Sequence, residues 1–150
     1  MSREHEPGMS IIVQTVARFT AGYILLYGIY IFMHGHVSPG GGFAGGVIVA
    51  LSFINVMLAY GKETAFKKLP KAVTAFFEDL GALMILSIAL FGFTSGYFFL
   101  NFISKGEPFK LFSAGIIPLC NLAIGLKVGA GIFAIFVALV LLRYEPEKKD

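Results

Sequence analysis

At 150 residues the chain has the length of one domain, yet 57% of it is hydrophobic, 14% is charged and its mean hydropathy is +0.80. So apolar a composition excludes a soluble globular protein, since the polar side chains are too few to cover a surface in water. The single cysteine, Cys120, excludes an internal disulfide framework, and the net charge of +3 lies in short segments rather than on a face for nucleic acid.

Four apolar stretches predict an all-α protein, an integral membrane bundle of four transmembrane helices. Each is near or above the roughly 20 residues that span the hydrocarbon of a bilayer. The segments between them are about ten residues long, too short for a core of their own, so one membrane domain is expected over residues 1–150. The first stretch is too long for the apolar part of a cleaved signal and is expected to remain as a helix. The predicted helices cover residues 11–33, 43–60, 73–102 and 116–142.

The connection after the first helix is rich in histidine and glycine. His34 and His36 flank one residue, but two ligands are too few for a metal, and no third ligand lies nearby in the sequence, so no metal site is predicted. Because histidine exchanges protons near neutral pH, the two residues are candidates for a proton relay at the mouth of the membrane. The alternative is that they are interface histidines without a transport function.

Small residues recur at every fourth position in the second, third and fourth predicted helices. This spacing lets helix backbones approach closely in lipid, where packing rather than hydrophobicity drives association. Glycine is also common in membrane helices in general, which accounts for some of these positions. We expect the others to pack against neighbouring helices, including helices of other subunits. The residues are Gly42, Gly46 and Ala50, then Gly92 and Gly96, then Gly125 and Gly129.

Two consecutive carboxylates, Glu78 and Asp79, stand near the start of the third predicted helix. With Val73 taken as the membrane boundary, Glu78 lies about 7 Å deep at ~1.5 Å per residue. Consecutive side chains point about 100° apart on a helix, so at most one of the two faces a given partner. Both are candidates for an ion or proton relay, and Asp79 has an alternative role in offsetting the helix macrodipole.

Lys127 lies close to the middle of the fourth predicted helix, where a charge costs about 2.5 to 3.5 kcal/mol on insertion scales. A lysine at that depth faces a protein interior or hydrated cavity, pairs with a carboxylate, or gives up its proton. Counted along the helices, its level differs from that of Glu78 by about 15 Å, which predicts no direct ion pair unless the helices are strongly tilted or broken. Lys127 is thus either a relay residue or an assembly pin paired with another subunit's carboxylate.

The distribution of lysine and arginine predicts the orientation in the membrane. Nine basic residues lie near one set of helix ends, and Lys105 and Lys110 lie near the other. Lys127 belongs to neither set. Because the basic side faces the cytoplasm, both termini and residues 61–72 are predicted to be cytoplasmic, with residues 34–42 and 101–115 outside. The basic side holds Arg3, Arg18, Lys62, Lys67, Lys68, Lys71, Arg143, Lys148 and Lys149.

The segment HGHVSPGGGFAGG, residues 34–46, resembles the signature of the B subunit of Mrp-type multisubunit sodium/proton antiporters, also called the Mnh family (MnhB-like). Residues 77–82, FEDLGA, are similar to the acidic-Gly-Ala segment of that family, and residues 118–128 are similar to its Asn, Gly and Lys pattern. The resemblance runs from about Gln14 to Leu142. Asp79 departs from the family's pattern, so the resemblance assigns it no role. B-like subunits also occur in membrane-bound, energy-converting hydrogenases and related respiratory complexes.

The resemblance implies a small multi-pass subunit of a cation/proton antiporter in the cell membrane of a prokaryote. The implied partners are other membrane subunits, Na⁺, H⁺ and lipid, and no nucleic acid. It implies no enzyme activity and no cofactor, and the sequence contains no Walker loop, Rossmann fingerprint, nucleophile elbow or HExxH motif. The alternatives are the equivalent subunit of a hydrogenase or respiratory complex, a purely structural packing subunit, and an independent four-helix channel.

Overall fold

The computed structural model describes residues 9–61, 70–94, 96–107 and 113–144. These residues contain four long α-helices and no β-strand, and all four helices are long and apolar enough to cross a membrane. The prediction of an all-α protein with four transmembrane helices is confirmed. The helices are α1 (Ile11–Met33), α2 (Gly41–Tyr60), α4 (Lys71–Thr94) and α5 (Ile117–Tyr144).

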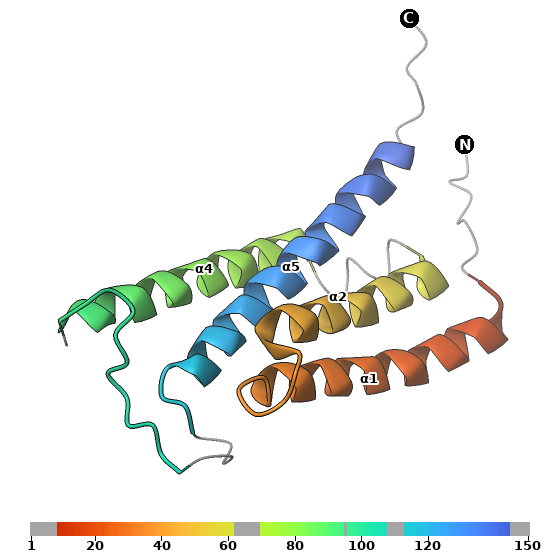
Figure 1. Ribbon diagram of the computed structural model, residues 1–150. Helices are drawn as coiled ribbons and strands as arrows, with labels where there is room; N and C mark the ends of the chain where they lie inside the picture. The colour runs from red at the N-terminus through yellow and green to blue at the C-terminus, as the bar shows by residue number, and fades with distance from the viewer. Residues whose placement is uncertain (1–8, 62–69, 95, 108–112, 145–150) are drawn as a thin grey trace, which may run out of the picture.

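The helices pack side by side in the order α1, α2, α5, α4 (Figure 1). α2 packs against α1 on one side and α5 on the other, and α5 in turn packs against α4. Helices that follow each other in the sequence run in opposite directions. The start of α1 and the end of α5 therefore lie toward the same end of the bundle (Figure 1). Given this packing order, α1 and α4 are the edge helices, and the other described helices cover each of them on one side.

The cytoplasmic location of that end stays a prediction, because no membrane is part of the structure. Several of the basic residues on which the prediction depends lie outside the described residues. They are Arg3, Lys62, Lys67, Lys68, Lys110, Lys148 and Lys149.

Glycines let α2 touch both of its neighbours backbone to backbone. A Cβ atom added to Gly46 would lie 2.7 Å from the carbonyl oxygen of Gly125 and 3.1 Å from the nitrogen of Gly129 in α5. On the α1 side, a Cβ atom on Gly45 would lie 2.9 Å from the carbonyl oxygen of Gly28. A Cβ atom on Gly42 would collide with the backbone of Asn121. Small residues thus set the helix spacing, as is usual where lipid gives no hydrophobic drive for helix association.

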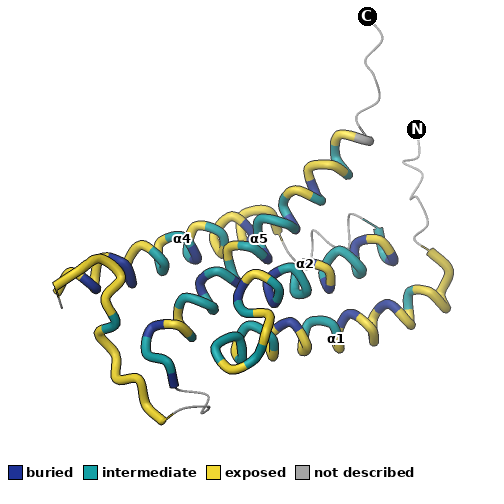
Figure 2. The backbone as a smooth tube through the Cα atoms, viewed as in Figure 1, coloured by how far each residue is buried: buried dark blue, intermediate teal, exposed yellow. Residues whose placement is uncertain are grey.

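Side-chain packing between α2 and α5 adds a small apolar cluster. Met57, Phe133 and Val137 are buried there, and the rings of Phe53 and Phe133 meet edge to face with 6.0 Å between their centroids. Large apolar side chains elsewhere are mostly exposed, and in Figure 2 the exposed residues of α1 line its outer side while the buried ones face α2. Such a distribution is expected of helices whose outer sides meet lipid or other subunits.

α4 ends at Thr94, whereas the sequence predicted a helix to Phe102. The chain turns at Gly96, whose φ of +125° is accessible to glycine at little cost. It then folds back on α4, so that the Phe99 N–H donates to the Ala89 carbonyl oxygen at 3.3 Å. Apart from Asn101, residues 97–102 are aromatic or aliphatic, and they fold back over the end of α4 instead of extending it. The other helix ends differ from the predicted ones by no more than two residues.

Two predicted packing glycines of this region therefore have different surroundings. A Cβ atom on Gly92 would lie 2.6 Å from the nitrogen of Leu100, so Gly92 packs against the returning segment instead of another helix. Gly96 lies beyond the helix in the turn, and no atom is within 4 Å of the position of its Cβ. The assignment of Gly96 to helix packing was wrong, since a positive φ takes it out of the helix.

Candidate functional site

An ion pair joins α4 to α5 inside their candidate membrane spans. The Nζ atom of Lys127 lies 3.5 Å from Oε1 of Glu78. The side chains keep 45% and 39% of their surface exposed, so both can be reached from outside this chain. Pairing offsets part of the cost that each charge has in an apolar surrounding. The two groups therefore form one site that contains an acid and a base within reach of each other.

The sequence predicted no direct pair unless the helices are strongly tilted or broken, because counting placed Glu78 and Lys127 at levels that differ by about 15 Å. The observed ion pair contradicts that difference in level. In the structure Glu78 lies opposite Gly131, with Oε1 3.9 Å from the position of a Cβ there. The C-terminal turns of α5 correspondingly project beyond the start of α4 (Figure 1). Gly131 is about one turn from Lys127, a separation that the long side chains of Lys127 and Glu78 bridge to reach the 3.5 Å contact. The error lay in the register of the two helices.

Gly81 is the residue that brings the two helices together, and the glycine spacing did not identify it. A Cβ atom on Gly81 would lie 2.7 Å from the Ala123 carbonyl oxygen and 2.9 Å from the backbone nitrogen of Lys127. Because Gly81 follows Glu78 by three residues, both lie on the face of α4 that meets α5. The available signal was a glycine one turn after a carboxylate in a membrane span, within the FEDLGA segment.

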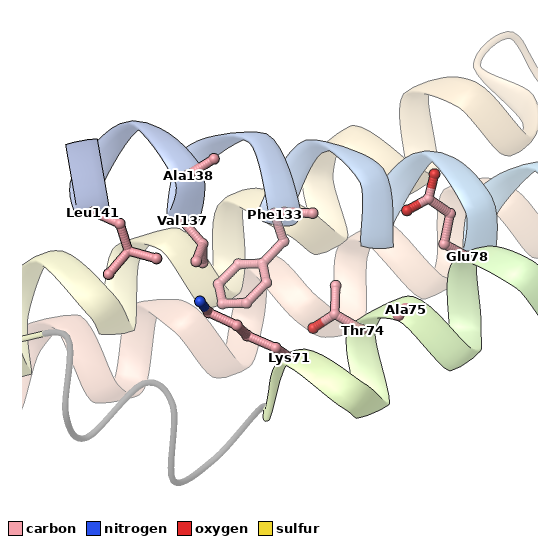
Figure 3. Close-up of a pocket in the computed structure, with 9 residues that line it drawn as sticks. Lys71, Thr74, Ala75, Glu78, Phe133, Val137, Ala138 and Leu141 are labelled. Carbon is pink, nitrogen blue, oxygen red and sulfur yellow. The ribbon is translucent and has the colours of Figure 1, made fainter.

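A groove of about 240 Å³ runs between α4 and α5 and has Glu78 in its lining (Figure 3). On the α4 side Lys71, Thr74 and Glu78 recur at helical spacing, with Lys71 near the start of the helix and Glu78 two turns further on (Figure 3). The α5 side is apolar and includes Phe133 and Val137. The groove thus links the first turn of α4 to the carboxylate of the ion pair.

The two histidines lie in the connection between α1 and α2, apart from this groove in the chain. The His34 ring stacks on Tyr30 with 4.2 Å between centroids, and its Nδ1 lies 3.2 Å from the Tyr30 carbonyl oxygen. The Ser38 hydroxyl donates to the His34 carbonyl oxygen at 3.1 Å, which closes the connection into a turn. His36 is half-buried in the same turn. The structure thus joins Glu78 to Lys127, and it holds His34 at the C-terminal end of α1.

Asn121 attaches this connection to α5. Its Oδ1 atom accepts a hydrogen bond of 3.4 Å from the N–H of Gly42, near the start of α2. Because Asn121 precedes Lys127 by six residues on α5, the same helix carries the anchor of the histidine connection and the lysine of the ion pair. Within the described residues no group of three or more His, Cys, Asp or Glu side chains is placed to hold a metal ion.

Asp79 is exposed on α4 and is not part of the ion pair. The macrodipole interpretation of this residue is also wrong, because α4 begins at Lys71 and its first turn holds no acidic residue. The field of a helix terminus falls off within the first turn, and Asp79 lies beyond the second.

The comparisons with known proteins agree with one another. Residues 12–134 match a family described as a domain related to the MnhB subunit of Na⁺/H⁺ antiporter. The B subunit of a Na⁺/H⁺ antiporter of Bacillus subtilis is 31% identical over 131 residues, which cover 87% of each chain. An uncharacterized protein of Methanocaldococcus jannaschii is 39% identical over 116 residues, which cover 70% of this chain and 42% of that protein.

A solved structure extends the likeness to three dimensions. One chain of the membrane-bound sulfane sulfur reductase, an archaeal respiratory membrane complex, is similar to this chain with a TM-score of 0.75 and 29% sequence identity. The match covers 93% of this chain and 63% of that one. This chain therefore spans a smaller share of the Methanocaldococcus protein and of the reductase chain than of the Bacillus protein.

Proposed function

Because this chain belongs to the family of domains related to the MnhB subunit of Na⁺/H⁺ antiporters, we propose that it is a membrane subunit of a multisubunit cation/proton antiporter and that its Glu78–Lys127 pair moves protons. It is a multi-pass membrane protein of a prokaryotic family. Its proposed partners are the other membrane subunits of the complex, with Na⁺ and H⁺ as the exchanged ions and lipid around its outer helices.

The observation that carries the proposal is an acid and a base in contact inside two membrane spans. Moving the proton of the Lys127 ammonium to the Glu78 carboxylate turns two charges into two neutral groups. The pair is thus able to take up a proton and to release one, which is the elementary step of a relay.

The groove between α4 and α5 supplies an approach to this pair from the first turn of α4. That end of the helix is the predicted cytoplasmic one. Toward the opposite end of the bundle, His34 and His36 are the groups proposed to receive or deliver protons. The levels of the histidines and the ion pair differ, so waters or side chains of other subunits complete the route. The alternative of an independent channel is less well supported, since no continuous polar stripe links these groups along the described part of the chain.

The competing interpretation is that the ion pair has only a structural role, as a pin that holds α4 and α5 together. Its carboxylate comes from this chain and not from another subunit, so a pin would stabilise the fold of the subunit. The two interpretations differ at Lys127→Arg, because arginine keeps the charge and the ion pair but does not give up its proton.

The test uses the complete complex, coexpressed with its neighbouring subunits in cells that lack other Na⁺/H⁺ antiporters. Inside-out vesicles are given a proton gradient, and its collapse on addition of Na⁺ is followed with a fluorescent dye. A relay predicts that Lys127→Ala, Lys127→Arg and Glu78→Gln assemble but lose most exchange. Lys105→Ala, which removes a lysine outside the spans, is the matched control and retains exchange. Full exchange by Lys127→Arg contradicts the relay and supports the pin.

A second candidate function has its own observation. The likeness to a chain of an archaeal respiratory membrane complex covers nearly all of this chain, which favours an equivalent place in a redox-driven complex. Purifying the chain with its natural partners distinguishes the two. An antiporter exchanges Na⁺ for H⁺ in vesicles without any electron donor, whereas the respiratory candidate requires a donor and acceptor for ion movement.

A further inference from the structure

One face of α4 is not covered by the described part of this chain and carries a single charge, Asp79. The opposite face, which includes Thr74 and Gly81, is buried or packs against α5. On the uncovered face Phe76 is 61% exposed and Leu83 is 59% exposed, one turn before and one turn after Asp79. We call this surface the outer face of α4 and define it by Phe76, Asp79, Leu83, Leu86 and Leu90.

Asp79 lies too deep for lipid to be its only surrounding. It is eight residues from the start of the span Lys71–Thr94, about 12 Å along the helix axis. A charge at that depth is costly unless it is paired or hydrated. Lysine and arginine reduce this cost by extending their long side chains to the interface, but the aspartate side chain is too short to do so.

The described part of the chain does not supply a counter-ion to Asp79. Residues three and four positions away on α4 are Ala75, Phe76, Ala82 and Leu83, so no cation is within reach on the same helix. Lys127, the basic residue of α5 at the α4 crossing, pairs with Glu78. Within the described residues Asp79 makes no ion pair, so a cation of another molecule is a suitable counter-charge for it.

We propose that the outer face of α4 docks a transmembrane helix of a different subunit and that this helix presents a lysine or arginine at the depth of Asp79. The inference rests on the proposed membership of a multisubunit membrane complex. An apolar stripe with one carboxylate fits a helix that is apolar apart from one cation. The charge pair then sets the register and orientation of the two helices, as isolated polar residues do at other helix interfaces.

A second copy of this chain is a less suitable occupant. Among the described residues its best matching group is Arg18, which is exposed on α1 and lies about 10 Å along the axis from the start of that helix. α1 and α4 are the opposite edges of the row, so a contact between Arg18 and Asp79 would join copies head to tail. Head-to-tail contacts produce rings or open chains rather than closed pairs. A subunit of different sequence satisfies Asp79 without that consequence.

The experiment places the photo-crosslinking residue p-benzoylphenylalanine at position 83 in the intact complex, with position 139 of α5 as control. Leu139 is similarly exposed, at 60%. We expect the probe at 83 to label a transmembrane peptide of another subunit that contains a lysine or arginine at the matching depth. Asp79→Lys should reduce this product about tenfold or more, relative to the amount of chain in the membrane, because like charges would then meet. The control product should not change.

Exchanging the charges completes the test. Changing the identified cation to aspartate should restore the crosslink in the Asp79→Lys background, while Asp79→Asn, which is less disruptive, should give an intermediate yield. Products formed with lipid alone, or full assembly of Asp79→Leu, would overturn the proposal. A crosslink to a second copy, restored by combining Asp79→Arg with Arg18→Asp, would also overturn it. A failure of Lys127 variants to affect ion exchange leaves these crosslinks unchanged, so the two proposals fail separately.

Discussion

Gly81→Ala tests whether close contact between α4 and α5 creates the ion pair. The added Cβ atom would lie 2.7 Å from the Ala123 carbonyl oxygen, and the backbones must separate by about 0.7 Å to restore an ordinary contact of 3.4 Å. The two nearest atoms, the Ala123 carbonyl oxygen and the Lys127 backbone nitrogen, belong to the backbone, and the third, the Lys127 Cβ at 3.0 Å, is fixed to it, so no side-chain rotation relieves the clash. Overpacking of this kind costs about 1 to 3 kcal/mol. The same separation lengthens the Glu78–Lys127 distance from its present 3.5 Å.

The assay is the thermal stability of the detergent-solubilised complex, measured as the fraction that stays assembled after heating. Gly22→Ala is the matched control, because no atom lies within 4 Å of the position of its Cβ in the middle of α1. That substitution should be neutral or stabilising by up to about 1 kcal/mol, since alanine is the better helix former. Gly81→Ala should lower the midpoint of the transition, and Gly81→Leu should lower it further.

A double-mutant cycle links this loss to the pair. Glu78→Gln and Lys127→Gln should be non-additive in the natural sequence, because each removes the partner of the other. In the Gly81→Leu background the coupling should fall to near zero. If Gly81→Ala is as stable as Gly22→Ala, or the coupling survives in the leucine variant, then the contact at Gly81 does not position the pair.

Two further predictions concern packing and topology. Gly46→Leu should prevent most of the complex from assembling in a native gel, because a Cβ there would already lie 2.7 Å from the Gly125 carbonyl oxygen, and full assembly would contradict the close contact. In a Cys120→Ser background, Ser38→Cys should react with an impermeant thiol reagent added outside the cell and Thr64→Cys only after lysis, and the opposite pattern would reverse the predicted orientation.

Much of the architecture was predictable from the sequence because the bilayer constrains it strongly. A segment that spans hydrocarbon needs a long apolar run, so four runs predict four helices with ends within two residues of those observed, except at the end of α4. The same physics singled out Lys127 and Glu78, since charges inside apolar runs are costly. The histidine and glycine signature and the family were readable from local sequence, as the match over residues 12–134 shows.

What the tertiary structure decided is how these elements lie against each other. Hydropathy cannot tell an apolar helix from an apolar segment that folds back, and the positive φ of Gly96 makes that difference at the end of α4. Depths counted from the membrane boundaries assume that all helices begin and end at the same level. The relative level of α4 and α5 is instead fixed by the contact of Gly81 with Ala123 and Lys127. The Glu78–Lys127 pair follows from that contact. The order α1, α2, α5, α4, which leaves Asp79 on an uncovered edge, also depends on which glycines meet across space, and no one-dimensional pattern records it.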